Sequence, residues 1–192
     1  EPDSLNRPLG ELSLLQASEK TTLLRDYNNT QVDYPSQATA HWLFEQQVIK
    51  TPDQIALVFA GQSLTYQQCN DRANQLAQHL RSAGLSPALS LDHQPQCIVA
   101  VLAEHSVEWV LAILAIFKAG GAYLPLDPRA PQARLMTLLN DSGAQIMLCH
   151  SHFQPSYQDF FNGKVFHLDQ PQLWQNQQDG AAMPEQVDDP LH

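Results

Sequence analysis

The stretch that decides the fold is Phe117-Lys118-Ala119-Gly120-Gly121-Ala122-Tyr123-Leu124-Pro125-Leu126-Asp127. It ends an apolar segment, residues 107–119, whose spacing predicts a helix capped by Ser106 and ended by the two glycines. Residues 122–126 then form a short extended segment, in which Pro125 limits the pairing of the backbone. A helix, a glycine stop and a strand in direct succession are typical of an α/β unit.

The same alternation extends in both directions along the chain. Helical spacing predicts helices that begin near Thr39 and after Thr65, Ser106 and Pro131. Apolar runs predict strands over 55–59, 63–66, 97–102, 145–149 and 164–168, the first two of which form a hairpin. The predicted fold class is therefore α/β: a partial doubly wound, mostly parallel sheet with flanking helices on both faces.

Three of the helices carry more detailed expectations. Thr65 and Gln68 have the spacing of a capping box. The helix that follows them should bury one face, made of Cys69, Ala73, Leu76, Ala77 and Leu80. The helix after Pro131 should bury Leu135, Met136, Leu138 and Leu139. Near the N-terminus, Ser18 is the expected cap of a short helix over 18–27.

Composition excludes several classes of function. The 192 residues carry a net charge of −10 and no basic cluster, which argues against nucleic acid and against an anionic membrane surface as partners. The longest apolar run, residues 107–117, is too short to span a bilayer. Cys69, Cys97 and Cys149 are widely spaced and form no CxxC pair. We therefore expect a cytoplasmic protein without a disulfide framework.

Two motifs carry a family resemblance. Residues 117–127 resemble the pattern Leu-Lys-Ala-Gly-x-Ala-Tyr-(Leu/Val)-Pro-(Leu/Ile)-Asp, from which only Phe117 departs. Residues 64–69 resemble Leu-(Thr/Ser)-Tyr-x-Glu-Leu, with Gln68 and Cys69 in place of the last two residues. Both patterns belong to the amino-acid adenylation domains of nonribosomal peptide synthetases, members of the adenylate-forming, AMP-binding superfamily. The resemblance implies a structural role for Leu64, Thr65, Tyr66, Lys118, Ala119, Gly120, Gly121, Ala122, Tyr123, Pro125 and Asp127.

The resemblance also implies an organisation of the chain. Residues 23–30 and 33–35 look like the linker that joins a condensation domain to an adenylation domain. We expect this linker over residues 1–38 and the N-terminal portion of the adenylation domain over 39–168. Residues 169–192 would be a loop or tail that leads toward the phosphate loop of the family. Residues 86–96 look like a local insertion.

Adenylation domains join an amino-acid carboxylate to the α-phosphate of ATP and then pass the aminoacyl group to a phosphopantetheine thiol on a carrier domain. That chemistry needs a Gly/Ser/Thr-rich phosphate loop with a lysine, and carboxylates for Mg²⁺ and the ribose. No such loop occurs in these residues. We therefore expect no catalytic, cofactor-binding or metal-binding residue here, with ATP, Mg²⁺ and phosphopantetheine belonging to the complete assembly.

Five side chains could nevertheless be taken for functional groups. Lys118 could contact phosphate, but its place at a helix C-terminus favours contact with backbone carbonyls. Asp127 lies between prolines and favours a turn over a metal site. Ser106 lacks the surroundings of a nucleophile and is expected to cap a helix. His150 and His152 flank a strand end beside Cys149, without an evident third metal ligand and second shell.

The leading hypothesis is a scaffold portion of an adenylation domain that is inactive alone. Its partners would be an upstream condensation domain, the remainder of the adenylation domain and a downstream carrier domain. An alternative is a naturally truncated, non-catalytic remnant that docks on a condensation domain. A third hypothesis, a standalone acyl-CoA-ligase-like enzyme, agrees less well with the linker and with the Ala-Tyr-Leu-Pro-Leu-Asp sequence.

Overall fold

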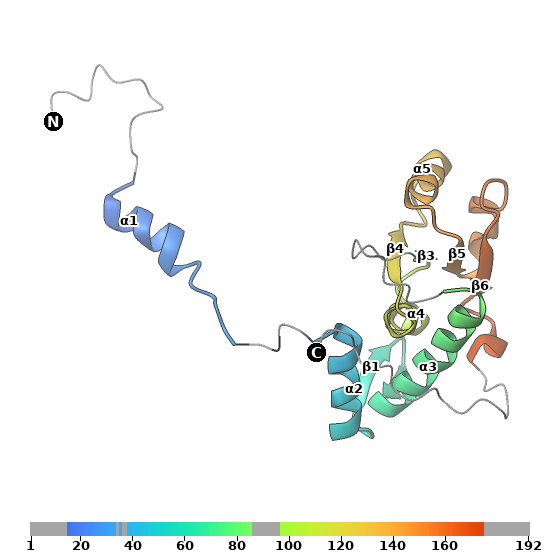
Figure 1. The fold of residues 1–192 in the computed structure, drawn as a ribbon, viewed down its shortest axis with the longest axis horizontal. Coiled ribbons are helices and arrows are strands. Elements are labelled where there is room, and N and C mark those ends of the chain that lie inside the picture. Colours follow the sequence, from blue (N-terminus) through green and yellow to red (C-terminus); the bar gives the residue numbers. More distant parts are fainter. Residues whose placement is uncertain (1–14, 34, 36–37, 86–96, 175–192) are drawn as a thin grey trace, which may run out of the picture. The chain divides into compact units, whose positions relative to one another are not determined.

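The computed structural model describes residues 15–33, 35, 38–85 and 97–174 (Figure 1). Two compact units, Glu1–Gln37 and Ala38–His192, are described separately. The first contains the short helix α1 (Ala17–Thr21), which continues into a π-helical turn, η3 (Thr22–Asp26). The expectation that Ser18 caps this helix is wrong, because the helix already begins at Ala17. The backbone N–H of Gln16 instead donates to the Glu19 carboxylate at 3.2 Å.

The second unit is built on a four-stranded parallel sheet with the order β4-β3-β5-β6. The strands are β3 (Ile98–Leu102), β4 (Ala122–Leu126), β5 (Ile146–Cys149) and β6 (Lys164–His167). The two inner strands, β3 and β5, are almost entirely buried. Burial on both faces explains why their sequences are unbroken apolar runs. Among the described strands β4 pairs only with β3, so Pro125 lies on an edge strand, where its missing N–H is tolerated.

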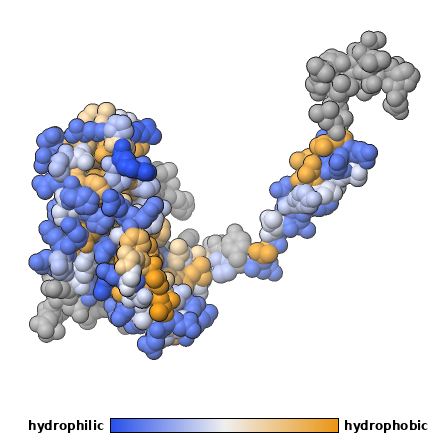
Figure 2. Space-filling model, turned by 180° about the vertical axis from the view of Figure 1, so that it is seen from behind, coloured by the Kyte–Doolittle hydropathy of each residue, from blue (hydrophilic) through white to orange (hydrophobic). Residues whose placement is uncertain are grey.

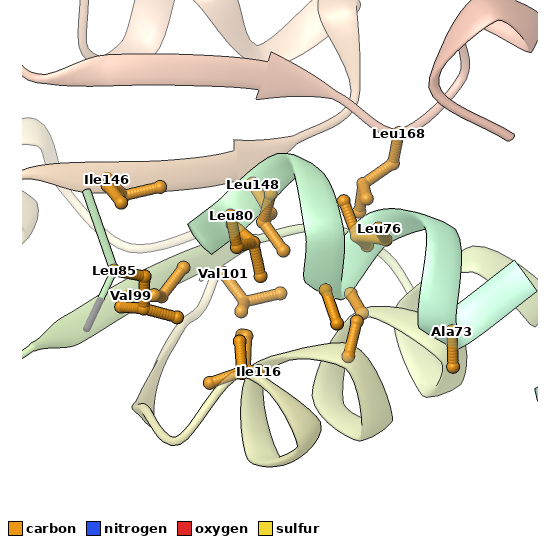
Figure 3. Close-up of a cluster of buried hydrophobic side chains, with 14 of the residues drawn as sticks. Ala73, Leu76, Leu80, Leu85, Val99, Val101, Ile116, Ile146, Leu148 and Leu168 are labelled. Carbon is orange, nitrogen blue, oxygen red and sulfur yellow. The ribbon is translucent and has the colours of Figure 1, made fainter. Parts of the chain in front are cut away.

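Helices cover both faces of this sheet, which confirms the predicted α/β class (Figure 1). Helices α3 (Tyr66–Ser82) and α4 (Val107–Lys118) pack on the face that carries Val99, Val101, Ile146 and Leu148. Figure 3 shows the resulting cluster, in which side chains of α3 and α4 meet those of the strands. The predicted buried face of α3 is confirmed residue by residue: Cys69, Ala73, Leu76, Ala77 and Leu80.

Helix α5 (Gln132–Ser142) covers the opposite face of the sheet. Leu135 and Leu139 are buried there against alternate residues of β3 and β5, and Leu138 is partly buried. The placement of Met136 in the core is wrong, because its side chain is 42% exposed. Leu135 and Leu139 lie one turn apart on the same stripe of the helix, whereas Met136 is rotated about 100° away from it.

A hairpin and a further helix lie beside the main sheet. Strands β1 (Ile55–Phe59) and β2 (Gln62–Thr65) form a two-stranded antiparallel sheet of their own. Its turn has φ values of 48° at Ala60 and 82° at Gly61, the positive values that tight hairpins need. Helix α2 (Ala40–Lys50) begins after Thr39, whose hydroxyl accepts from the N–H of Trp42. Phe44 and Leu57 pack against a shared cluster: Leu64, Cys69, Val107 and Leu111.

The chain continues in two 3-10 turns, η4 (Ser151–Ser156) after β5 and η5 (Pro171–Trp174) after β6. In η5, Leu173 is buried in the α3–α4 cluster, and the indole of Trp174 donates to the carbonyl of Leu168 at 2.8 Å. Within the described ranges, no helix has both the length and the apolar character needed to cross a bilayer. The predicted insertion over 86–96 and most of the predicted tail lie outside the described residues.

Candidate functional site

Lys118 is the charged residue of the glycine motif, and it is buried. Its side chain is 3% exposed, and its ammonium donates to the carboxylate of Glu45 on α2, which is 41% exposed. The expectation that Lys118 contacts helix carbonyls is wrong. The carbonyl of Lys118 instead accepts from the guanidinium of Arg81 on α3. The last turn of α4 is therefore bonded to two neighbouring helices.

The two glycines perform different structural tasks. Gly120 has a φ of 82°, which the chain needs in order to turn out of α4. Gly121 lies against other parts of the chain: a Cβ placed there would be 3.1 Å from the Leu85 side chain and 3.2 Å from the Cys97 carbonyl oxygen. The motif thus leaves the helix at one glycine and passes close to the start of β3 at the next.

The rest of the motif forms the edge strand and the turn that follows it. The ring of Tyr123 stacks edge-on against Phe117 with 5.8 Å between centroids. Asp127 accepts from the backbone N–H of Arg129 at 2.9 Å and from its guanidinium at 3.1 Å. The hydrogen bond with the Arg129 side chain lowers the pKa of Asp127. This is the turn geometry expected for Asp127.

The other motif, Leu64 to Tyr66, joins the hairpin to α3. The Thr65 hydroxyl accepts from the N–H of Gln68 at 3.2 Å, and the Thr65 N–H donates to the Gln68 side chain at 2.9 Å. The predicted capping box is therefore confirmed. Leu64 is buried, and the ring of Tyr66 lies 5.7 Å from that of Phe44. This motif fixes the direction in which α3 leaves the hairpin.

Polar side chains also gather where β5 and β6 end. The Cys149 sulfur lies 3.3 Å from the Tyr157 hydroxyl and 3.6 Å from Nδ1 of His167. Burial raises the pKa of Cys149 to about 11, and burial also raises that of Tyr157. A thiol with so high a pKa is a poor nucleophile at neutral pH. The arrangement therefore suits packing better than covalent catalysis.

Beside this group, the loops after β5 and β6 are bonded together. Both the N–H and the hydroxyl of Ser151 donate to the Asp169 carboxylate. Burial alone would raise the pKa of Asp169, but these hydrogen bonds outweigh it and lower the pKa. The rings of His150 and His152 stack 5.7 Å apart. Over the described part of the chain, no three His, Cys, Asp or Glu residues are placed to hold a metal ion.

The glycine motif does not fit a bound polyphosphate. A phosphate loop offers free N–H groups at the start of a helix. Here the N–H of Gly120 donates to Phe117 and that of Gly121 to Ile116, at 3.0 and 2.9 Å. Both glycines follow the negative end of α4. The ammonium of Lys118 is likewise engaged inside the molecule, by Glu45.

Comparison with known proteins assigns the chain to a family. The family model of AMP-binding enzymes matches residues 44–189, which is most of the chain. The chain belongs to the AMP-binding enzyme family. The match includes most of α2, the hairpin, the main sheet and both motifs described above.

Relatives among curated proteins are nonribosomal peptide synthetases. Tyrocidine synthase 3 of Brevibacillus parabrevis is 48% identical over 147 residues, which cover 77% of this chain and 2% of the synthase. Gramicidin S synthase 2 of Aneurinibacillus migulanus is 39% identical over 181 residues, 94% of this chain and 4% of the synthase. The latter match extends into the first 37 residues. The chain spans only 2 to 6% of the length of such relatives.

Solved structures agree with this assignment. The nonribosomal peptide synthetase FmoA3 in its AMPPNP-bound form is 29% identical with a TM-score of 0.60, covering 75% of this chain and 15% of that one. O-succinylbenzoate Coenzyme A synthetase of Bacillus subtilis shares the fold at 21% identity and a TM-score of 0.60, over 72% of this chain and 34% of that one. The chain thus has the fold of adenylate-forming enzymes, in the form found in adenylation domains.

Sequence reasoning did not identify Glu45 or Arg81 as partners of the motif. Glu45 lies 73 positions before Lys118 in the chain, and Arg81 lies 37 positions before Lys118. Neither residue lies in a recognisable motif, so no local pattern could have indicated the pairing. Helical spacing placed both on helices, but only the packing of α2 and α3 against α4 brings them to Lys118.

Proposed function

We propose that the chain is the N-terminal scaffold portion of a nonribosomal peptide synthetase adenylation domain. The complete domain would activate an amino acid with ATP to an aminoacyl-AMP and load it on a phosphopantetheine carrier domain. ATP and Mg²⁺ would be held by residues outside this portion. The portion by itself would bind and activate nothing.

One observation carries this proposal. The motif at residues 117–127 is engaged internally, with the ammonium of Lys118 on Glu45, the glycine N–H groups on helix carbonyls and Asp127 on Arg129. Groups that are bonded in this way hold neighbouring elements together. Its role as scaffold therefore follows more readily from the geometry than a role in chemistry.

The test compares two proteins in amino-acid-dependent ATP–pyrophosphate exchange. One is the 192-residue chain. The other, called the chimera, is this chain followed by the part of the Tyrocidine synthase 3 adenylation domain that lies C-terminal to the matched region. We expect exchange from the chimera and none from the 192-residue chain. Exchange by the 192-residue chain alone would contradict the proposal. A folded chimera that shows no exchange with any amino acid tested would also contradict it.

Partners and compartment follow from the same proposal. An upstream condensation domain, the remainder of the adenylation domain and a downstream carrier domain would be its neighbours in a multidomain synthetase. The long match to Gramicidin S synthase 2 supports a condensation-to-adenylation linker over residues 1–38. The cytoplasm is the compartment we propose, since Cys69, Cys97 and Cys149 are free thiols that a reducing environment preserves.

A docking protein is the second candidate, and one feature favours it. In residues 15–33, the apolar side chains of Leu24, Tyr27 and Val32 are 62 to 71% exposed, and exposed apolar side chains are available for contact with a partner. Co-purification of the 192-residue chain with an excised condensation domain would support docking. A gain of exchange activity in the chimera would favour the scaffold role.

A further inference from the structure

Helix α2 buries little of its surface. Of its eleven residues only Val48 is buried, whereas α3 buries five residues and α4 buries six. Trp42, Leu43 and Ile49 are 44 to 74% exposed, and Figure 2 shows hydrophobic surface over this part of the globular unit. A helix of this length is only marginally stable in water by itself. The helical state of α2 therefore depends on a small number of tertiary contacts.

Two kinds of contact hold α2 in place. On its apolar side, Phe44 packs against the cluster that contains Leu111, and its ring lies 5.7 Å from that of Tyr66. On its polar side, Glu45 accepts from the ammonium of Lys118, whose side chain is 3% exposed. An ammonium that is out of water is costly without its partner. The ion pair therefore stabilises the attached position of α2.

The chain is fixed again directly after α2. The N–H of Gln67 donates to the carbonyl of Pro52 at 3.0 Å, and the N–H of Tyr66 donates to the carbonyl of Gln54 at 2.9 Å. Both bonds tie the segment after α2 to the first turn of α3. Thr51 lies between the end of α2 and these bonds. The helix can therefore come away as far as Thr51 while the hairpin and α3 keep their own contacts.

We propose that α2 detaches reversibly while the main sheet stays folded, and that the Glu45–Lys118 pair sets how often it detaches. Detachment returns both charges to water, so neither is left buried without a partner. Because α2 is the first element of the second unit, its detachment lengthens the connection between the two units by eleven residues. This behaviour needs only the 192-residue chain and does not depend on the remainder of an adenylation domain.

Amide hydrogen exchange of the 192-residue chain tests the proposal with two variants that act on different parts of the molecule. Glu45→Gln weakens the attached position, so the amides of α2 should exchange at least about tenfold faster. Leu148→Ala leaves a cavity in the cluster under α3 and α4, which contains no residue of α2. It should speed exchange in β3 and β5 at least about tenfold and leave α2 at its original rate, because α2 detaches while the sheet is intact.

The response of α2 to Leu148→Ala decides whether the helix detaches by itself. If α2 opened only when the whole unit unfolds, Leu148→Ala would speed exchange in α2 and β3 by the same factor, and the proposal would be overturned. Ile146→Val removes one methyl group from the same cluster and allows the same comparison at a smaller loss of stability, should Leu148→Ala fail to fold. Exchange in α2 that does not respond to Glu45→Gln would also overturn the proposal.

A third variant separates the ion pair from other effects of a substitution in α2. Lys118→Met removes the ammonium, so Glu45→Gln should change α2 exchange by less than about threefold in the Lys118→Met background. Glu104→Gln removes an exposed carboxylate outside α2 and is the control, for which the exchange rates of α2 should stay unchanged. An equally large effect of Glu45→Gln with and without the ammonium would mean that another contact holds α2, and the proposal would be wrong.

Discussion

At the scale of single residues, the Lys118–Glu45 pair is the contact with the clearest energetic consequence. The two charges differ in environment, with Lys118 3% and Glu45 41% exposed. An ammonium that is out of water needs its partner, whereas a half-exposed carboxylate can be hydrated when its partner is lost. Removing the charge of Glu45 should therefore change the free energy of unfolding by a different amount from removing the charge of Lys118.

We predict that Glu45→Gln lowers the free energy of unfolding by about 2 kcal/mol, because it leaves the buried ammonium without a counter-charge. Lys118→Met should cost less than about 1 kcal/mol, and Glu45→Gln should add little in the Lys118→Met background. Urea unfolding of the single and double variants measures this. Glu104→Gln, at an exposed site, is the control. Equal losses of unfolding free energy in Glu45→Gln and Lys118→Met would contradict this prediction.

Cys149 predicts a dependence of stability on pH. Its pKa rises from 9.0 to about 11 in the folded chain. The folded state then binds more protons than the unfolded state between these values, so stability is fully present below pH 9 and is lost as pH rises toward 11. We expect a loss of about 2 kcal/mol over this range, reduced in Cys149→Ala. Urea unfolding at several pH values measures this loss. A free energy of unfolding that stays constant from pH 9 to 11 would mean that the thiol is accessible to water and would contradict the prediction.

The Cys149–Tyr157 contact gives a second readout at the same site. Alkylation of Cys149 by iodoacetamide at pH 8 should be about two orders of magnitude slower than that of an ordinary thiol, because so little thiolate is present. Mass spectrometry of the labelled peptide reports the rate. Labelling of Cys149 in urea, where burial is lost, provides the reference.

At the scale of elements, α3 depends on its first turn. Thr65 and Gln68 satisfy each other's backbone N–H groups, and the same threonine ends β2. The cap therefore couples the hairpin to a helix that packs on one face of the main sheet. Helix α4 is organised in the same way, with the Ser106 hydroxyl accepting from the N–H of Trp109 at 3.1 Å.

Thr65→Ala should lower the free energy of unfolding by about 1 kcal/mol, because the N–H of Gln68 loses its acceptor. Thr65→Ser keeps the hydroxyl and should recover most of this loss. Thr137→Ala, on the exposed side of α5, removes a hydroxyl that bonds only within its own helix and should change stability little. Thermal unfolding compares the three variants, and a neutral Thr65→Ala would exclude the cap as a stabilising contact.

At the scale of the whole molecule, stability is concentrated where the sheet is covered on both faces. Strands β3 and β5 separate the cluster under α3 and α4 from the cluster under α5. Successive residues of the same strand belong to different clusters, as Leu148 and Cys149 do. The two inner strands therefore connect both halves of the core.

Leu148→Ala should lower the free energy of unfolding by about 3 kcal/mol, because Leu148 is fully buried and its loss leaves a cavity. Met136→Ala should cost less than about 1 kcal/mol, since Met136 is 42% exposed and is not part of the core. Chemical denaturation monitored by tryptophan fluorescence compares the two. A similar loss in both variants would mean that α5 buries more of its surface than its exposed fraction indicates.

Most of the fold was predictable from the sequence by itself. Periodicity placed the hairpin, the inner strands and the buried face of α3, because these depend on local spacing and on apolar runs. Capping chemistry placed the starts of α3 and α4, since a cap needs only residues a few positions apart. The family motifs were also recognisable, because each is a continuous stretch of chain.

Only the tertiary structure decided which residues contact the glycine motif at residues 117–127. The expected contact of Lys118 with helix carbonyls followed from its local position, but α2 brings Glu45 to it from 73 positions away. Met136 was likewise predicted as buried, because spacing defines a stripe on α5 but not how much of it the sheet covers. Long-range packing sets which groups meet and how far water is excluded, and neither property is encoded in the spacing of neighbouring residues.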